Sequence, residues 1–192
     1  FALCFPADEP DTYYVQAWHW LPESVAADPR AVNPYRQWHG EGRLRLTPGD
    51  VADHEYIKAD IVKIIEENGY VLRDFAFDPW EAESLTQALE EGHGLTRVKF
   101  PQTVGNFAEP TREFERLVLA GGLRHDDNTL LNWQMRNVTV KQDPNGNMRP
   151  VKPPLGDHRK IDGAVASIMA LARAIAAENE SSVYEDRGLR TI

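Results

Sequence analysis

The chain opens with two apolar runs that are separated by a polar turn. Residues 1–6 and 13–21 are rich in residues that favour β-strands, and the stretch Ala-Asp-Glu-Pro-Asp between them is turn-forming. This pattern predicts an antiparallel hairpin. A short helix is expected next at 35–42, where a glycine ends the pattern, and a short strand at 43–47.

The middle of the chain alternates between helical and strand periodicity. Isoleucines recur at helical spacing between Asp53, a candidate N-cap, and Gly69, a candidate stop signal. A strand at 71–77, a helix at 78–91 and a strand at 95–100 are expected to follow. A strand, helix and strand of these lengths imply parallel pairing through a right-handed crossover.

The second half of the chain repeats this alternation. We expect a helix at 109–119, a polar loop at 125–128 and a hairpin of strands 137–141 and 148–151 around an Asn-Gly turn. A long helix at 161–177 is apolar on nearly every side in its first half, which is typical of a helix buried against a sheet. The sum is an α/β fold: a mixed sheet flanked by helices on both faces.

Length and composition indicate a single globular domain. The chain has 192 residues, of which 42% are hydrophobic and 27% charged. We assign residues 1–179 to the domain and 180–192 to a C-terminal tail. Because the apolar run at Phe1 has no turn or cap before it, we expect a fragment of a longer protein. A single cysteine and no apolar stretch of about 20 residues favour a soluble protein of a reducing, cytoplasmic compartment, without contact to a membrane.

Charge gives a mixed indication about nucleic acids. A net charge of −9 argues against tight non-specific binding to phosphates. A late segment nevertheless gathers positive side chains into a possible basic strip: Lys141, Arg149, Lys152, Arg159 and Lys160. An ordinary solvated loop explains the same residues equally simply.

Two aspartates stand at positions where catalytic groups are found. Asp78 follows a predicted strand at its carboxyl end, although Pro79 and Glu81 after it also make a helix-capping arrangement. Asp162 opens the long apolar helix, where a buried carboxylate needs a partner. A metal ion shared with another carboxylate would be such a partner, and so would the helix dipole. The pattern leaves both alternatives open for each residue.

Other polar and aromatic residues give weaker indications. Lys152, in a proline-flanked loop, could reach a phosphate or a metal-bound water, and His125, beside two aspartates, could be a ligand or proton carrier. Both are also typical surface residues. Trp20, Trp80 and Trp133 are interpreted as core or interface aromatics. No phosphate-binding, dinucleotide or serine-nucleophile motif is present, so nucleotide hydrolysis is not supported within these residues.

Several short pieces, by their order and spacing, carry a resemblance to a known family. In chain order they are Trp20-Leu-Pro22, Tyr35 with Trp38, Leu46-Thr-Pro-Gly49 with Asp53, Phe77-Asp-Pro-Trp80, Leu123-Arg-His125, Trp133 with Asn137, Asn145-Gly-Asn147 through Arg149-Pro150 and Lys152, and Lys160-Ile-Asp-Gly163 with Ala166. Over most of its length the chain resembles the C-terminal half of large terminase subunits of tailed bacteriophages.

The resemblance implies an RNase H-like nuclease domain whose acidic cluster binds two Mg²⁺ or Mn²⁺ ions. Asp78 matches the family's acid at the end of the fourth strand and Asp162 the acid on the closing helix, while Lys152 and His125 remain weaker site candidates. The family's first acid lies on a first strand, upstream of Phe1, so this fragment would hold two acids of a three-acid site.

The implied function is metal-dependent endonuclease cleavage of concatemeric double-stranded DNA during genome packaging in the bacterial host. The implied partners are DNA, an upstream ATPase domain, the portal and the small terminase subunit. One alternative is a non-catalytic DNA-gripping or motor-docking module of the same fold. Another RNase H-like enzyme, such as a resolvase or integrase, is disfavoured because the pieces after Gly121 have no expected counterpart there.

Overall fold

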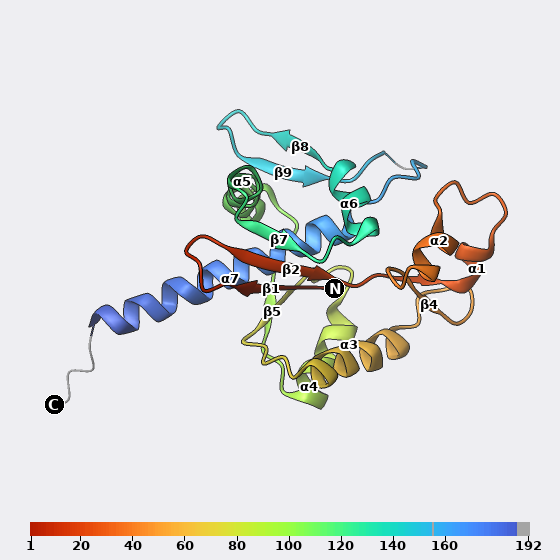
Figure 1. Cartoon of the computed structure of the whole chain (residues 1–192), viewed down its shortest axis with the longest axis horizontal. Helices are drawn as coiled ribbons and strands as arrows, with labels where there is room; N and C mark the ends of the chain where they lie inside the picture. The colour runs from red at the N-terminus through yellow and green to blue at the C-terminus, as the bar shows by residue number, and fades with distance from the viewer. Residues whose placement is uncertain (155, 188–192) are drawn as a thin grey trace.

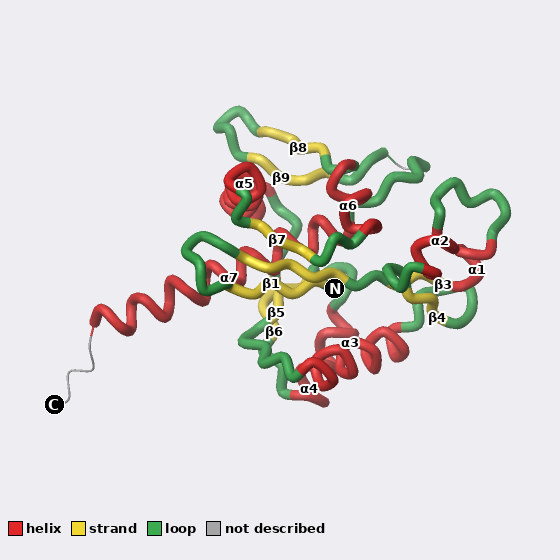
Figure 2. Tube along the Cα trace, viewed as in Figure 1, coloured by secondary structure: helices red, strands yellow, loops and turns green. Residues whose placement is uncertain are grey.

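The computed structural model describes residues 1–154 and 156–187, which form a mixed α/β structure (Figure 1 and Figure 2). Its helices are α1 (Glu23–Ala27), α2 (Tyr35–Gly40), α3 (His54–Asn68), α4 (Glu83–His93), α5 (Val104–Ala120), α6 (Thr129–Arg136) and α7 (Asp162–Arg187). Its strands are β1 (Ala2–Pro6), β2 (Tyr13–Ala17), β3 (Trp20–Pro22), β4 (Arg45–Thr47), β5 (Phe75–Phe77), β6 (Arg97–Lys99), β7 (Leu123–His125), β8 (Thr139–Gln142) and β9 (Met148–Val151).

The N-terminal hairpin is confirmed, and a third strand joins it. β1 pairs antiparallel with β2, and β2 pairs parallel with β7. The prediction of a polar loop from residue 125 was therefore wrong at its first residue, because β7 extends through His125. The predicted strand at 13–21 is interrupted after Ala17, and its last part becomes β3, which pairs with β4 at one end of the molecule (Figure 2).

The predicted strand–helix–strand unit is confirmed in its parallel pairing. β5 and β6 are parallel and are connected by α4. The helix begins at Glu83, however, and not at Asp78 as predicted, because residues 78–82 form a turn. Helix α3 follows the expected pattern: the Asp53 side chain accepts a hydrogen bond from the Tyr56 backbone at 3.0 Å, and Gly69 ends the helix with a φ of 65°.

α5 and α6 also differ from the sequence prediction. α5 begins at Val104 instead of 109, since Thr103 caps it and Pro110 is accommodated inside the helix. α6 was not predicted; it begins where the Asn128 side chain accepts hydrogen bonds from the backbones of Leu130 and Leu131. The hairpin of β8 and β9 is confirmed.

The strands do not form the single mixed sheet that was predicted. The described strands form one three-stranded sheet, β1-β2-β7, and three two-stranded sheets. Helix α7 packs against β1, β2 and β5 and so connects two of these sheets (Figure 1). A buried core joins β2, α5 and α7 through Tyr13, Phe114, Leu117, Ile168 and Leu171.

The tryptophans lie in different environments. Trp20 and Trp133 are half-buried, and the Trp133 ring lies 5.0 Å from the ring of buried Trp38, as expected for core aromatics. Trp80 is 89% exposed, so its interpretation as a core residue was wrong.

Helix α7 is longer than predicted and runs to Arg187, where Figure 1 shows it extending away from the sheets. The predicted tail, 180–192, thus starts within this helix, and its residues 188–192 lie outside the described part of the chain. Among the described residues, none of the helices combines the length and hydrophobicity needed to cross a membrane.

Candidate functional site

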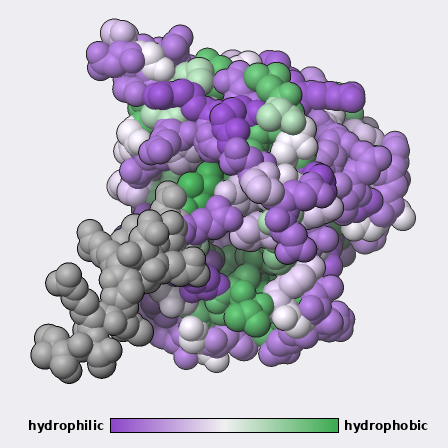
Figure 3. Space-filling view, turned by 60° about the vertical axis from the view of Figure 1, so that its left-hand side comes forward, coloured by the Kyte–Doolittle hydropathy of each residue, from purple (hydrophilic) through white to green (hydrophobic). Residues whose placement is uncertain are grey.

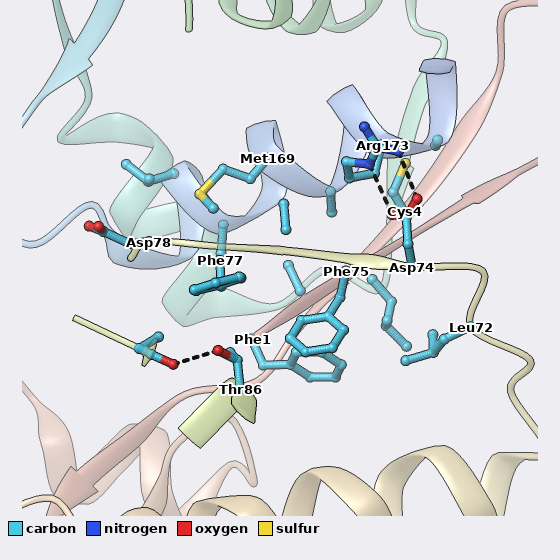
Figure 4. A pocket seen from close by; sticks show the side chains of 18 of the residues that line it. Phe1, Cys4, Leu72, Asp74, Phe75, Phe77, Asp78, Thr86, Met169 and Arg173 are labelled. Atoms are coloured by element: carbon cyan, nitrogen blue, oxygen red, sulfur yellow. Dashed lines mark hydrogen bonds and ion pairs between the residues drawn. The ribbon is translucent and has the colours of Figure 1, made fainter. Parts of the chain in front are cut away.

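A cavity of about 980 Å³ lies between β1, β5 and α7. Residues 1–6 and 71–78 line it without a break, and one side of α7 contributes Val165, Met169 and Arg173. Figure 4 shows the phenylalanine rings of Phe1, Phe75 and Phe77 gathered in it. On one face of the whole molecule, patches of hydrophobic surface are framed by hydrophilic surface (Figure 3).

Strand edges border this cavity. β1 pairs with β2 alone and β5 with β6 alone among the described strands, so each has one edge without a strand partner. Since consecutive residues of a strand point to opposite faces, a strand whose every residue lines a cavity presents its edge to that cavity. The cavity is therefore an apolar groove between two unpaired strand edges, which we call the β1–β5 groove.

Asp78 is fixed at one end of this groove by a tight turn. Its Oδ1 accepts a hydrogen bond from the Trp80 backbone at 3.0 Å, and its carbonyl oxygen accepts from Ala82 at 3.0 Å. The predicted capping role thus applies to a turn and not to α4. Among the described residues, nothing donates to Oδ2 of Asp78, so one carboxylate oxygen is free to bind a ligand.

Asp162 lines the same groove from the first residue of α7. Its carboxylate lies 3.2 Å from the Lys152 ammonium, and the two side chains are 59% and 70% exposed. The prediction that this carboxylate enters a buried neighbourhood was therefore wrong: Ile161 and Gly163 beside it are buried, whereas the acid itself reaches solvent. Because an exposed ion pair is weak, the Asp162 carboxylate can release Lys152 and bind a metal cation instead.

The structure brings together three of the four predicted site residues. Asp78, Asp162 and Lys152 line the groove, and His125 does not. His125 ends β7, is exposed, and its Nδ1 accepts a hydrogen bond from the Asp127 backbone at 3.1 Å. β7 pairs with β2, which is not a groove strand, so His125 is not among the described residues that line the groove, and its site role stays a prediction.

The carboxylates of Asp78 and Asp162 can supply some, but not all, of the oxygen ligands of a hard divalent cation. Mg²⁺ prefers six oxygen ligands and usually keeps several waters, so one or two carboxylates can hold it when further oxygens complete the shell. In the described part of the chain, no group of three or more His, Cys, Asp or Glu residues is placed to hold a metal ion. Asp78 and Asp162 are therefore suited to be part of a cation site that needs at least one more donor.

Three other groove residues, Asp74, Arg173 and Cys4, have structural roles. Asp74 makes a two-pronged ion pair with Arg173 across the groove, with N···O distances of 2.7 and 2.9 Å. Figure 4 shows this pair and Asp78 at opposite ends of the β5 segment. Cys4 also lines the groove, and burial raises the pKa of its thiol to about 12, so it stays protonated and is a poor nucleophile.

The basic strip is partly neutralised by acids. Lys152 pairs with Asp162, and Arg159 pairs with Asp157 at 2.7 Å. Lys141 is exposed and lies directly opposite Arg149 in the β8–β9 hairpin. Like charges that face each other across strands repel. An anion beside the hairpin would relieve this repulsion.

Sequence reasoning missed a buried cluster beside Asp162. His19 is only 9% exposed, and neither ring nitrogen meets a hydrogen-bond partner of good geometry among the described residues. Gln134 accepts a hydrogen bond from the Gly163 backbone, and a Cβ at Gly163 would overlap both the His19 ring and the Gln134 amide oxygen. A glycine directly after Asp162 inside a helix was the available signal, since glycine is unfavourable there without a packing reason.

We expect His19 to make the fold less stable as the pH falls from about 6.5 to about 4. Burial lowers the pKa of His19 from 6.5 to about 4, against a smaller raising effect of Asp162. The unfolded chain therefore binds this proton first, and stability is lost as the pH falls through the window. The loss is at most roughly 3 kcal/mol, at about 1.4 kcal/mol per pKa unit.

Denaturant unfolding of the wild type and of His19→Gln at about pH 4.5 and pH 7 measures this effect. The variant should lose less stability at the lower pH than the wild type does. An identical loss in both proteins would contradict the role of His19.

Comparisons with known proteins identify the family of this chain. The family described as terminase large subunit, endonuclease domain, matches residues 1–178. Protein YmfN of Escherichia coli K12 is 30% identical over 195 residues, and the match covers 94% of this chain and 41% of that protein. The large terminase subunit of Enterobacteria phage HK97 is 30% identical over 158 residues, with 81% of this chain and 31% of that protein covered.

Comparison with solved structures points to the same relative, the HK97 large terminase. The crystal structure of the HK97 bacteriophage large terminase superposes with a TM-score of 0.77 at 29% identity, covering 88% of this chain and 35% of that one. The chain thus spans less than half the length of these relatives. With its family model matched over residues 1–178, the chain belongs to the endonuclease domain family of terminase large subunits.

Proposed function

We propose that this chain is an RNase H-like nuclease domain that cuts double-stranded DNA with divalent metal ions during phage genome packaging. The observation that carries the proposal is that Asp78 and Asp162, from distant parts of the sequence, line one groove. Both match the acids that the family resemblance assigns to catalysis. Lys152 joins them through its ion pair with Asp162.

The β1–β5 groove supports the RNase H-like assignment. A strand that precedes Phe1 in the longer protein, as the family resemblance implies, would occupy this groove and pair with both unpaired edges. Strands in a sheet are spaced by about 4.8 Å, so one inserted strand joins two sheets into one. Helix α7 already packs against β1 and β5 and would cover the completed sheet. An acid at the end of that strand would supply the further donor which the site needs.

The residues of this chain would each have a defined part in cleavage. Asp78 and Asp162 would hold the divalent ions, and the turn at Asp78 keeps its carboxylate in place before DNA arrives. The Lys152 ammonium can leave the Asp162 carboxylate and pair with a DNA phosphate instead. Bound divalent ions supply an activated water and stabilise the leaving 3′-oxygen. The protein's contribution is to position these charges at a groove that is otherwise apolar.

DNA binding would rest on local positive charge despite the net charge of −9. Lys141 and Arg149 face each other on the β8–β9 hairpin, and Arg149 and Lys152 line the groove. Contacts of this kind go to phosphates and carry no sequence information, so we propose cutting without base specificity. The longer protein would add an ATPase domain and act with the portal and the small terminase subunit in the bacterial cytoplasm.

One observation favours a second candidate function, a non-catalytic module of the same fold that grips DNA or docks the motor. Within the described residues, no three acids are placed together as a complete metal cluster would need. Such a module would bind DNA and leave it intact.

Plasmid cleavage separates the two functions. The full-length protein should nick and linearise supercoiled plasmid in Mg²⁺ or Mn²⁺ and stop when EDTA is added, while residues 1–192 alone should cut far more slowly. If the full-length protein binds the plasmid but does not cut it in Mg²⁺ or Mn²⁺, the nuclease function is rejected and the DNA-binding module is favoured.

A further inference from the structure

Trp80 is exposed beside the proposed cleavage site. It is 89% exposed, whereas Trp38 is buried and the other three tryptophans are half-buried. Indole is the largest apolar side chain, and leaving it in water forfeits the stabilisation that burial would give. A single exposed apolar residue is common on protein surfaces, so a binding role for Trp80 rests on the groups that lie beside it.

The turn that holds Asp78 also fixes Trp80. The Trp80 backbone donates to the Asp78 carboxylate at 3.0 Å, and Pro79 between them restricts the backbone. Two residues span at most about 7 Å of chain, so the indole begins close to the carboxylate. Trp80 and Asp78 are thus linked by one turn, and a ligand that extends from Asp78 over the exposed side of this turn would meet the indole.

A positive charge lies at the same end of the β5–β6 sheet. Lys99 stands opposite Phe77, the residue before Asp78, and the backbones are held by a 2.9 Å hydrogen bond from Phe100 to Phe77. Lys99 is exposed, and none of the described acids forms an ion pair with it. An acid, an indole and an ammonium group are therefore displayed together, a combination that suits a nucleotide with its phosphate.

We propose that Trp80 packs against the nucleotide next to the phosphodiester that is cut, and that Lys99 contacts the neighbouring phosphate. This inference rests on the proposed nuclease function and adds a contact between the protein and its DNA substrate. Nucleotides follow one another about every 3.4 Å along a strand, so a group within about 7 Å of Asp78 reaches the first or second neighbour. In a duplex the sugar of every nucleotide offers an apolar edge outside the base stack, and contacts to sugar and phosphate are independent of sequence.

The test compares Trp80→Ala, Trp80→Phe and Leu119→Ala in the full-length protein, with a supercoiled plasmid as substrate. Leu119 is the matched control because it is also an exposed large apolar residue, at 81%, and lies on α5 outside the groove. Trp80→Ala should raise the KM for plasmid roughly tenfold with little change in kcat, as expected for the loss of one apolar contact made by a large side chain. Trp80→Phe should restore most of this loss, and the melting temperatures of all three should match the wild type.

Two outcomes would overturn the inference while leaving the nuclease standing. An unchanged KM in Trp80→Ala would mean that the indole contacts another protein or nothing. A lowered melting temperature that Trp80→Phe does not recover would assign it a purely structural role. Failure of the wild type to cut in any divalent metal is a different result, because it rejects the proposed function and this inference with it.

Discussion

Asp78→Asn and Asp162→Asn should each abolish metal-dependent cleavage by the full-length protein while leaving its fold intact. Loss of a metal ligand costs several kcal/mol of transition-state stabilisation, which is about a thousandfold in rate at roughly 1.4 kcal/mol per tenfold. Little stability depends on either charge. The Asp162–Lys152 pair is exposed and worth about 1 kcal/mol at most, and the amide oxygen in Asp78→Asn would still accept the Trp80 hydrogen bond. Initial rates on plasmid and thermal unfolding measure the two properties.

Asp74→Asn is the matched control for this result. Asp74 lines the same groove four residues before Asp78, but its carboxylate is paired with Arg173 and is only 13% exposed. Breaking such a pair should lower the free energy of unfolding by about 2 kcal/mol, because the largely buried Asp74 carboxylate no longer offers its charge to Arg173. Cleavage below the melting temperature should persist. If Asp74→Asn were as inactive as Asp78→Asn, the groove acids would not have the separate roles assigned to them.

Gly163→Ala should destabilise the protein by about 2 kcal/mol and reduce cleavage about a hundredfold. A methyl group at this position would overlap the buried His19 ring and the Gln134 amide oxygen. Because His19 and Gln134 are buried and have little room to retreat, we expect the start of α7 to move, and Asp162 with it. Displacement of a reacting group by as little as about 1 Å is enough for a loss of this size. Chemical denaturation and plasmid cleavage should therefore change together.

Gly105→Ala is the control for the substitution itself. Gly105 is the second residue of α5, as Gly163 is of α7, but no atom lies within 4 Å of the position that its Cβ would take. Alanine in an open helical position should raise stability by up to about 1 kcal/mol and leave cleavage unchanged. Equal effects of the two substitutions would show that the His19–Gln134 contact does not position Asp162.

Local signals predicted the elements whose ends carry their own chemistry. Asp53 and Gly69 delimit α3 because a capping carboxylate and a left-handed glycine act within a few residues. The β8–β9 hairpin forms around its Asn-Gly turn for the same reason. Pairing between strands far apart in the sequence could not be predicted from such local signals. β7 is a strand because it pairs with β2, and the polar sequence around His125 gives no indication of this pairing.

The candidate site was predicted as a set of residues but not as an environment. Asp78 and Asp162 were identified by position and by resemblance, and the structure places both at one groove. Their surroundings depend on tertiary contacts. Asp162 opens a largely apolar helix, yet its carboxylate faces Lys152 and solvent, since the buried side of that helix begins at its neighbours. The partnership of His19 with Gly163 joins residues far apart in the chain and has no local pattern.

Direct location of bound Mn²⁺ tests the central claim, that Asp78 and Asp162 jointly hold the cleaving metal. Crystals of the full-length protein grown with Mn²⁺ should show anomalous scattering peaks in contact with both carboxylates, and the peaks should disappear in Asp78→Asn or weaken strongly. Mn²⁺ bound elsewhere in a protein that cuts DNA, with neither carboxylate among its ligands, would contradict the account.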